Sequence, residues 1–430
     1  MTSRAFDEPP TTHATLPSGL KVVVVHQAHL HSASAQLLLR VGSRYEDVEE
    51  AGLSHFLEHM TYRGSERYPS ALALARAFEG LGGGLFAETS RELTSYQVDS
   101  PPESLIELLG VLADAVLRPT FTELEVEKRI VLEELLEDRG EDGRLVRPDD
   151  VVRRLAFPDH SIGLPIVGTE ASVSSFTREA LAAHHARYTA GANAVLAVAG
   201  PLAPELVLEA AEAAFEGMGR GARAVPAPAE VLFGPRFLHV DDSESQTTLD
   251  LMFQGVPEPH PLYGAQSLLL RVLDDGLSTR LHRRVVDELG LAYGVSASPE
   301  VLEDTVLVDI VTSSAHSSTA SLLEAILQLT SELREAPPEA AELEMAKRRL
   351  IWDVQASLDG PRAMTEVFGA SALLGQQLSL SERVNRVLAA KPEEVLEAAR
   401  LLFGAGRVAV AAVGRLKRSG RAALARLLEA

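Results

Sequence analysis

The stretch that most constrains this chain is residues 51–60, AGLSHFLEHM, which contains the pattern His-x-x-Glu-His at His55, Glu58 and His59. On a helix, residues four apart lie on the same face, so the two histidines can offer their rings to one metal ion with Glu58 beside them. The apolar residues follow the i, i+3, i+4, i+7 spacing of a buried helical stripe, at Leu53, Phe56, Leu57 and Met60. The alternative is an amphipathic surface helix whose two histidines bind nothing.

A metal site of this kind needs a third protein ligand, and the best donors lie in the acidic segment 121–138. Thr122 and Glu125 have the spacing of a capping box, so we expect a helix here. Glu127 and Glu134 are two helical turns apart on one face, and such a pair can serve as a ligand and a supporting carboxylate. The alternative is a solvated acidic helix.

Composition narrows the classes of function. The net charge of -21 argues against nucleic acid or an anionic membrane as a partner. The chain has no cysteine, so disulfides, thiolate metal sites and cysteine catalysis are excluded, and histidine and carboxylate remain as ligands. We find no apolar run of signal-peptide length in residues 1–18 and no span-length run later, and expect a soluble cytoplasmic protein.

The chain of 430 residues is long enough for two or three domains. Residues 217–235 are rich in Gly, Ala and Pro and are expected to be a linker between domains at 1–216 and 236–430. The order helix, strand, glycine, helix occurs late in each part, around Gly200 and Gly414. This internal repeat predicts two α+β halves of similar size.

The second half has a histidine-free helix at Tyr263–Leu273 where the first half carries His-x-x-Glu-His, so only the first half is expected to hold metal. Leu85–Val98 has the pattern of one strand. Two other groups of histidines are not expected to bind metal. They are an adjacent pair expected on a helix surface and three expected in a solvated hairpin turn: His184 and His185, and His26, His29 and His31.

His-x-x-Glu-His followed about 75 residues later by a glutamate in E-K-x-V-V-x-E-E resembles the pitrilysin-type (M16) zinc peptidases, and in particular the M16B group that is related to mitochondrial processing peptidase subunits. Four further stretches resemble family segments: Gly82–Tyr96, Phe157–Gly168, Leu277–Leu281 and Gly290–Tyr293. The resemblance implies an α+β fold of two homologous α/β-sandwich halves, each a mainly antiparallel sheet packed with helices.

For the site, the resemblance implies one Zn²⁺ per chain, held by His55, His59 and Glu134. Glu58 is then the general base toward water at the metal, and Glu127 is the supporting carboxylate. Cobalt or manganese could occupy the same set of two nitrogens and one oxygen.

For the substrate, the resemblance implies that an extended peptide adds as a strand to the sheet edge and also contacts Tyr293. The edge residues are Leu85, Phe86, Ala87, Glu88 and Thr89. The chain departs from the family pattern at two positions. Phe86 stands where the family usually has Asn, and Val286 stands where it usually has Arg, seven residues before the tyrosine.

The function implied is a zinc endopeptidase subunit that hydrolyses peptides or unfolded polypeptides inside a closed dimeric chamber. Because Val286 replaces the arginine, we expect a heterodimer in which a sister subunit without metal supplies the Arg and Tyr; a homodimer is the alternative. Two other functions stay open. One is a structural scaffold, and the other is a peptide-binding member that holds metal but turns over weakly.

Overall fold

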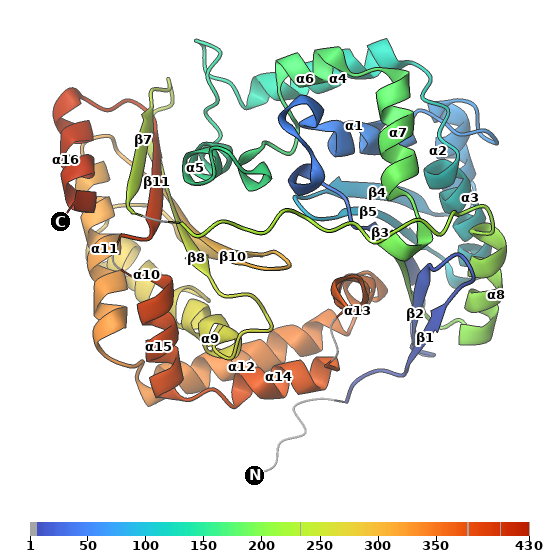
Figure 1. Ribbon diagram of the computed structural model, residues 1–430. Coiled ribbons are helices and arrows are strands. Elements are labelled where there is room, and N and C mark those ends of the chain that lie inside the picture. Colours follow the sequence, from blue (N-terminus) through green and yellow to red (C-terminus); the bar gives the residue numbers. More distant parts are fainter. Residues whose placement is uncertain (1–6, 233, 376–377, 405, 430) are drawn as a thin grey trace. The chain divides into compact units, whose positions relative to one another are not determined.

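The structure is a computed structural model that describes residues 7–232, 234–375, 378–404 and 406–429 (Figure 1). Its contacts divide the chain into two compact units, each built from three segments. The first unit contains Met1–Leu135, Leu164–Ala227 and Asp353–Ser379. The second contains Leu136–Gly163, Pro228–Trp352 and Leu380–Ala430.

The first unit is organised on a six-stranded sheet with the order β1-β2-β6-β3-β5-β4 in the described chain. The strands are β1 Thr11–Thr15, β2 Lys21–His26, β3 Ala33–Leu39, β4 Gly84–Thr89, β5 Thr94–Ser100 and β6 Ala194–Gly200. β2 and β6 are parallel and the other neighbours are antiparallel. The central strands β3 and β6 are buried along their whole length, whereas β4 is an edge strand with a half-exposed pattern. Because β4 lies at the end of the sheet, a further strand can pair with its outer side.

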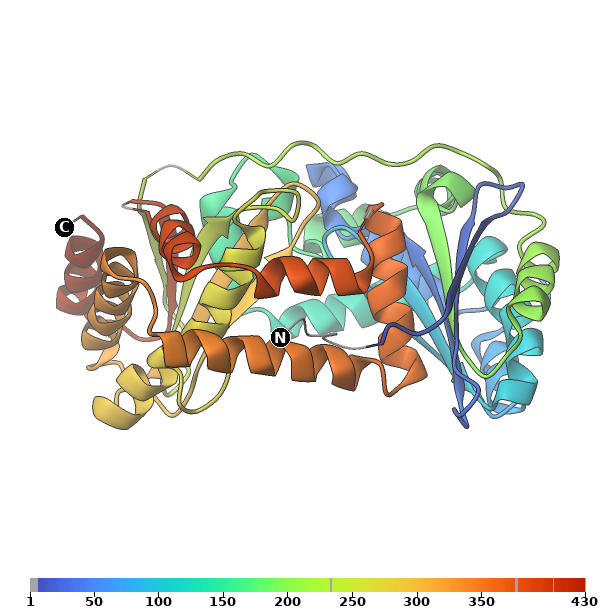
Figure 2. The same ribbon diagram turned by 90° about the horizontal axis from the view of Figure 1, so that it is seen from below.

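Helices cover both faces of this sheet. The helices of this unit are α1 Leu53–Thr61, α2 Ala71–Glu79, α3 Leu105–Leu117, α4 Leu124–Glu137, α6 Glu170–Ser175, α7 Arg178–Tyr188, α8 Pro204–Ala214 and α13 Pro361–Leu374. α3 and α8 pack on one face and α13 on the other, as Figures 1 and 2 show. Gly369 lets α13 approach closely, because a Cβ atom there would lie 2.7 Å from a methyl carbon of Leu38.

The second unit repeats this plan on a five-stranded sheet with the order β7-β11-β8-β10-β9. Its strands are β7 Arg236–Val240, β8 Thr247–Gly255, β9 Val295–Val301, β10 Val306–Ser314 and β11 Val408–Val413. Its helices are α5 Pro148–Ala156, α9 Tyr263–Leu273, α10 Arg280–His282, a π-helix Arg283–Glu288, α11 Thr319–Glu335, α12 Ala340–Ser357, α14 Leu380–Leu388, α15 Pro392–Leu402 and α16 Arg418–Glu429. α5 packs on one face of this sheet, and α9, α11 and α15 enclose the main apolar cluster on the other.

The two sheets have the same topology. In each sheet, five strands that follow one another in the sequence take the same spatial order, β2-β6-β3-β5-β4 in the first and β7-β11-β8-β10-β9 in the second. In both orders the first two strands are parallel. Gly200 (φ 154°) is the last residue of β6 and Gly414 (φ 139°) follows the equivalent strand β11, and at each a Cβ atom would lie within 2.8 Å of a neighbouring atom. The repeat that the sequence predicts is therefore a repeat of fold, and the α+β class is confirmed.

The two units nevertheless differ from a simple division of the chain at the linker. α5 and α13 take equivalent places in the repeat. In the first half, α3, α4 and then α5 follow β5, and in the second half, α11, α12 and then α13 follow β10. α5 and α13 each belong to the unit built mainly from the other half. The reason is packing: α5 buries Val151, Val152 and Ala156 against the second sheet, and α13 packs on β3 and β6 of the first.

The prediction of one strand over Leu85–Val98 is wrong. The segment forms the hairpin β4–β5, in which Ser90 and Leu93 are joined by a backbone hydrogen bond of 2.8 Å across the turn. The helices at 53–61, 263–273 and 392–402 lie where the sequence pattern predicts them. None of the helices in the described ranges has the length and hydrophobicity that a membrane span requires.

Candidate metal centre

Helix α1 carries the His-x-x-Glu-His pattern and is held at its start by a buried carboxylate. Glu46 accepts hydrogen bonds from the backbone N–H groups of Gly52 (2.7 Å) and Ser54 (2.6 Å). These are orphan donors of the first helical turn, and an acidic group satisfies them best. Gly52 has φ 88°, and a Cβ atom there would lie 2.4 Å from the carbonyl oxygen of Val167, so the helix can begin here only with glycine.

The apolar stripe of α1 fixes which way the histidines face. Leu53, Phe56, Leu57 and Met60 are all at most 5% exposed and share one cluster with Val131 and Leu135 of α4 and with Phe176 and Leu181. The polar residues of α1 also reach α4, because His59 contacts Glu127 and both His55 and His59 lie near Glu134. The helix and its buried stripe are as the spacing predicts.

Three side chains converge beyond this interface. Nε2 of His55 lies 3.6 Å from Oε1 of Glu134, and Nε2 of His59 lies 3.6 Å from Oε2 of the same carboxylate. The donors of a tetrahedral zinc site with metal–ligand distances of about 2.1 Å are about 3.4 Å apart. Among the described residues, these three form the one group of His, Cys, Asp or Glu side chains that could hold a metal ion, with all ligand atoms within 4.8 Å of one another.

The protonation of His55 suits a metal ligand. Burial, helped by the neighbouring His59, lowers the pKa of His55 to about 3, so its ring is neutral. Its Nδ1 atom is buried without a hydrogen-bond partner among the described residues. A neutral ring that carries its proton on Nδ1 presents the free lone pair of Nε2 toward Glu134, and a cation accepts that lone pair.

His59 is oriented by a carboxylate from α4. Its Nδ1 lies 2.8 Å from Oε1 of Glu127, and the other oxygen of Glu127 accepts a hydrogen bond from Arg63. Burial raises the pKa of Glu127, but the hydrogen bonds from His59 and Arg63 outweigh it and hold the pKa below its ordinary value. The ionised Glu127 therefore keeps the proton of His59 on Nδ1 and turns Nε2 toward Glu134, as outer carboxylates do at metal sites.

Glu58 lies on the same helix and is 8% exposed. Burial raises its pKa, and the negative charge of Glu134 raises it further, whereas a hydrogen bond from Thr89 lowers it. Oγ1 of Thr89 donates this bond to Oε2 of Glu58 at 2.6 Å. Glu58 is thus a carboxylate with a raised pKa beside the three converging side chains, which suits a group that takes up and releases a proton.

The residues predicted at the substrate edge divide into two groups on β4. Leu85 and Ala87 pack against the apolar core of the first unit, whereas the side chains of Phe86 and Glu88 are exposed. Arg362 of α13 lies over the Phe86 ring, with 4.7 Å from its guanidinium carbon to the ring centre. Thr89 is buried against Glu58, and Tyr293, which is 99% exposed, lies in the second unit.

The expectation that His184 and His185 lie on the surface is wrong. His184 is 4% exposed and its Nε2 lies 3.0 Å from the hydroxyl of Ser54 on α1, while Nε2 of His185 lies 2.7 Å from the carbonyl oxygen of Val116. Burial lowers the pKa of His184 to about 3, so it is a neutral hydrogen-bonding group in the packing of α7 against α1. Nδ1 of His26 lies 2.8 Å from the carbonyl oxygen of Leu202.

Two contributors to the site were not found in the sequence. Arg63 follows His59 by four residues, and this helical spacing could have indicated a shared partner such as Glu127. Glu46 precedes Gly52 by six residues in a segment without periodic pattern, so no local signal marks it as the cap of α1.

Comparisons with known proteins agree with this geometry. The profile of the family described as Insulinase (Peptidase family M16) matches residues 21–170, and that of the Peptidase M16 inactive domain matches residues 175–350. Zinc protease YmxG of Bacillus subtilis is 30% identical over 398 residues, covering 90% of this chain and 95% of the relative. A zinc protease of Rickettsia felis is 29% identical over 399 residues, covering 90% and 94%.

Solved structures agree on the fold. A protease from Helicobacter pylori superposes with a TM-score of 0.86 at 20% identity, covering 95% of this chain and 100% of the other. A peptidase M16 inactive domain from Pseudomonas fluorescens gives 0.86 at 21% identity, covering 94% and 98%. The two profiles in sequence, the relatives that span nearly the whole chain and the shared fold lead to one conclusion: this chain belongs to peptidase family M16.

Proposed function

We propose that this protein is a zinc-dependent endopeptidase subunit in which His55, His59 and Glu134 hold one zinc ion per chain. The observation that carries the proposal is the convergence of both Nε2 atoms on the two oxygens of Glu134, each at 3.6 Å. The names of the relatives as zinc proteases support the choice of metal. Zinc in such a site acts as a Lewis acid toward a peptide carbonyl and lowers the pKa of water.

The chain's own residues then handle the protons and the substrate. Glu58 accepts a proton from the attacking water on its carboxylate and passes it to the amine that leaves. Its position supports this role, because Glu58 lies on α1 between the two histidines and is 8% exposed. The edge strand β4 binds the peptide as an added strand through main-chain hydrogen bonds, so an extended backbone matters more than its sequence.

The first experiment compares cleavage of a quenched fluorescent peptide by the wild type and by Glu58→Gln. We expect Glu58→Gln to keep one zinc per chain and to lose about a hundredfold to ten-thousandfold in kcat, because the base is gone while the ligands remain. Glu133→Gln is the matched control, since Glu133 is exposed on α4 beside Glu134 and should leave both zinc and activity unchanged. Normal cleavage by Glu58→Gln would show that another group is the base.

The partner subunit is the second part of the proposal. Val286 packs against the core of the second unit, and its neighbours Arg283 and Arg284 both pair with Glu288. The guanidinium groups of Arg283 and Arg284 are therefore both engaged in ion pairs and do not replace the arginine that the family usually has at position 286. Tyr293 is 99% exposed. We therefore propose a heterodimer with a homologous subunit that lacks zinc and supplies the arginine.

The heterodimer is tested by measuring cleavage for the chain alone and after mixing with a homologous chain that carries the arginine and no His-x-x-Glu-His. We expect a gain in kcat/KM on mixing, together with a complex of twice the mass by sedimentation. Equal activity alone and mixed would support a homodimer instead.

A metal-holding, weakly active peptide-binding protein is the second candidate function. It is favoured by Phe86, which is 52% exposed on β4 and offers a ring where the family usually has an amide side chain. Tight binding of unstructured peptides with little cleavage, for both the lone and the mixed chain, would favour this function over the peptidase.

A further inference from the structure

Thr89 is the last residue of the edge strand β4, and its side chain is turned into the protein. It is 9% exposed and pairs across the hairpin with Thr94. Its Oγ1 lies 2.6 Å from Oε2 of Glu58, an ordinary distance for a hydrogen bond from a hydroxyl to a charged oxygen. The resemblance to the family suggested a substrate contact for Thr89, whereas its side chain contacts the proposed base.

The direction of this hydrogen bond follows from counting protons. An ionised carboxylate only accepts, so the single hydroxyl proton of Thr89 is donated to Glu58. Oγ1 of Thr94 lies 3.3 Å from Oγ1 of Thr89 and 3.2 Å from the carbonyl oxygen of Val41, so Thr94 has two acceptors for its own proton. Thr89 is thus free to donate to Glu58 without leaving its neighbour unsatisfied.

We propose that Thr89 is the positioning residue of the base: it occupies Oε2 of Glu58 and leaves Oε1 as the atom that accepts the proton from water. This inference rests on the proposed function, because it assigns a task to Thr89 in the reaction for which Glu58 is the base. It also joins two parts of the site, since the strand that binds the peptide ends in the residue that holds the base.

The joint matters because proton transfer depends on distance. A peptide that adds along β4 is fixed in register by the backbone of that strand. The Thr89–Glu58 bond then fixes Oε1 relative to the same strand, and misplacement of a reacting group by about 1 Å can reduce a rate about a hundredfold.

The test compares Thr89→Val, which keeps the shape and loses the hydroxyl, with Thr89→Ser, which keeps the hydroxyl. For Thr89→Val we expect kcat to fall about 10- to 100-fold with KM within about twofold, as for the loss of a hydrogen bond to a charged group. Zinc content should stay at one per chain. Thr89→Ser should remain within about threefold of the wild type, and Thr15→Val, at an exposed position of β1 in the same sheet, should behave as wild type.

A second measurement does not depend on activity. Thr89→Val should lower the melting temperature when Glu58 is present and should change it little in a Glu58→Leu chain, because the bond needs both partners. Equal shifts in the two backgrounds would show that Thr89 does not act through Glu58.

The outcomes separate the two proposals. If the wild type is active and Thr89→Val is equally active, the positioning role alone is overturned. A rise in KM at constant kcat for Thr89→Val also overturns it, because Thr89 would then be a substrate contact. An equal loss in Thr89→Val and Thr89→Ser also overturns it. A wild type that holds zinc and cleaves no peptide, alone or mixed, overturns the proposed function, and the role of Thr89 in the reaction falls with it.

Discussion

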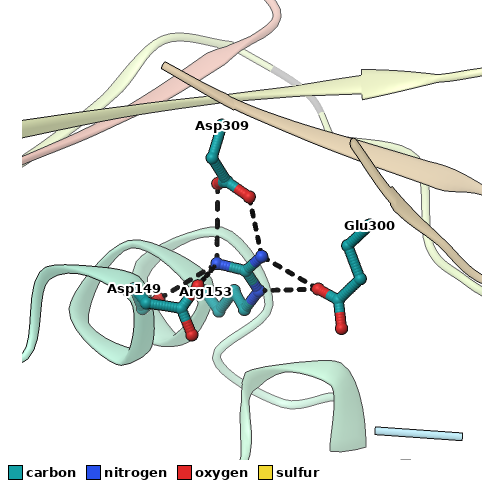
Figure 3. A network of polar contacts seen from close by, with 4 residues as sticks. All are labelled: Asp149, Arg153, Glu300 and Asp309. Carbon is teal, nitrogen blue, oxygen red and sulfur yellow. Dashed lines mark hydrogen bonds and ion pairs between the residues drawn. The ribbon is translucent and has the colours of Figure 1, made fainter. Parts of the chain in front are cut away.

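Replacing Arg153 with methionine should destabilise the second unit strongly, for a reason visible in Figure 3. The guanidinium on α5 is 3% exposed and bonds to carboxylates on three elements. Its Nη2 lies 2.7 Å from Oδ2 of Asp309 on β10 and 2.8 Å from Oε2 of Glu300 on β9, and its Nη1 bonds to Asp149 on α5. Asp250 on β8 is 1% exposed, and neither of its oxygens has a hydrogen-bond partner among the described residues.

The size of the effect follows from what the substitution leaves behind. Methionine fills similar space but removes the positive charge, so the acids on the α5 face of the sheet remain buried without it. Removing one partner of a buried ion pair costs about 3–5 kcal/mol. We therefore expect the free energy of unfolding to fall by about 3–5 kcal/mol at pH 7.

The loss should depend on pH in a definite direction. Burial raises the pKa of Asp309 above its ordinary value of 3.8, and Arg153 opposes that rise. Burial and the charge of Asp309 raise the pKa of Asp250 in the same way. A carboxyl whose pKa is raised on folding adds stability that is complete below pH 3.8 and is lost as the pH rises through the folded value. Without Arg153 both pKa values rise further, so the gap between wild type and variant should widen from pH 5 to pH 8.

The assay is urea unfolding followed by circular dichroism, with hydrogen exchange of the β8 and β10 amides to assign the loss to the second unit. Arg415→Met is the control, because Arg415 is exposed in the same unit and its loss should cost less than about 0.5 kcal/mol. Asp250→Asn should stabilise the protein increasingly above pH 5. A loss below 1 kcal/mol for Arg153→Met, or one that is the same at pH 5 and pH 8, would refute the reasoning.

Three further predictions concern the metal centre. Glu127→Ala should weaken zinc binding about 10- to 100-fold in a chelator competition, because His59 loses its orienting partner, while Glu133→Ala should not; equal affinities would contradict the role of Glu127. Glu46→Ala should lower stability by about 1–2 kcal/mol in thermal melts, because the first N–H groups of α1 lose their cap; an unchanged melting temperature would exclude the cap. Removing zinc with a chelator should lower the melting temperature and adding zinc should restore it, since a ligand that binds the folded state stabilises it. A melting temperature that is the same with and without zinc would contradict the site.

Local patterns predicted the elements of the site but not all of its contacts. The spacing of His55 and His59 and the apolar stripe on the other side of their helix are properties of one helix, and they are found as the period requires. The repeat around Gly200 and Gly414 was likewise readable, because a strand, a strained glycine and a helix follow one another in sequence. Glu46 could not be recognised, since its partners are set by how a loop folds back on α1.

The same distinction explains the errors. His184 and His185 are adjacent and polar, which indicates a surface, yet tertiary packing of α7 against α1 and α3 gives each ring a hydrogen-bond partner, buries His184 and partly buries His185. The sequence pattern predicts one strand for the hairpin β4–β5 because its turn, Ser90–Leu93, contains no glycine or proline. Hydrogen bonds from the hydroxyl and backbone of Ser90 to Leu93 close that turn instead.

The exchange of α5 and α13 between the units raises the question of what directs each helix to its sheet, since the two sheets share one topology. The α5 face of the second sheet presents Asp309 and Asp250, and α5 supplies Arg153. The α13 face of the first sheet presents Gln97, which lies 3.3 Å from the hydroxyl of Thr365 on α13, and the partly exposed Asp99, whose Oδ2 lies 3.1 Å from Nε of Arg362 at the start of α13.

Exchanging the two helices would leave Asp309 and Asp250 of the second sheet without Arg153. Each uncompensated buried charge costs several kcal/mol, whereas a buried pair in place adds little net stability over an apolar contact. The Arg153 network is therefore better explained as a device that selects the correct helix than as a source of net stability. The triple variant Arg153→Met, Asp309→Leu and Asp250→Asn should then recover much of the free energy of unfolding that Arg153→Met loses. It should also weaken the preference of the second sheet for α5.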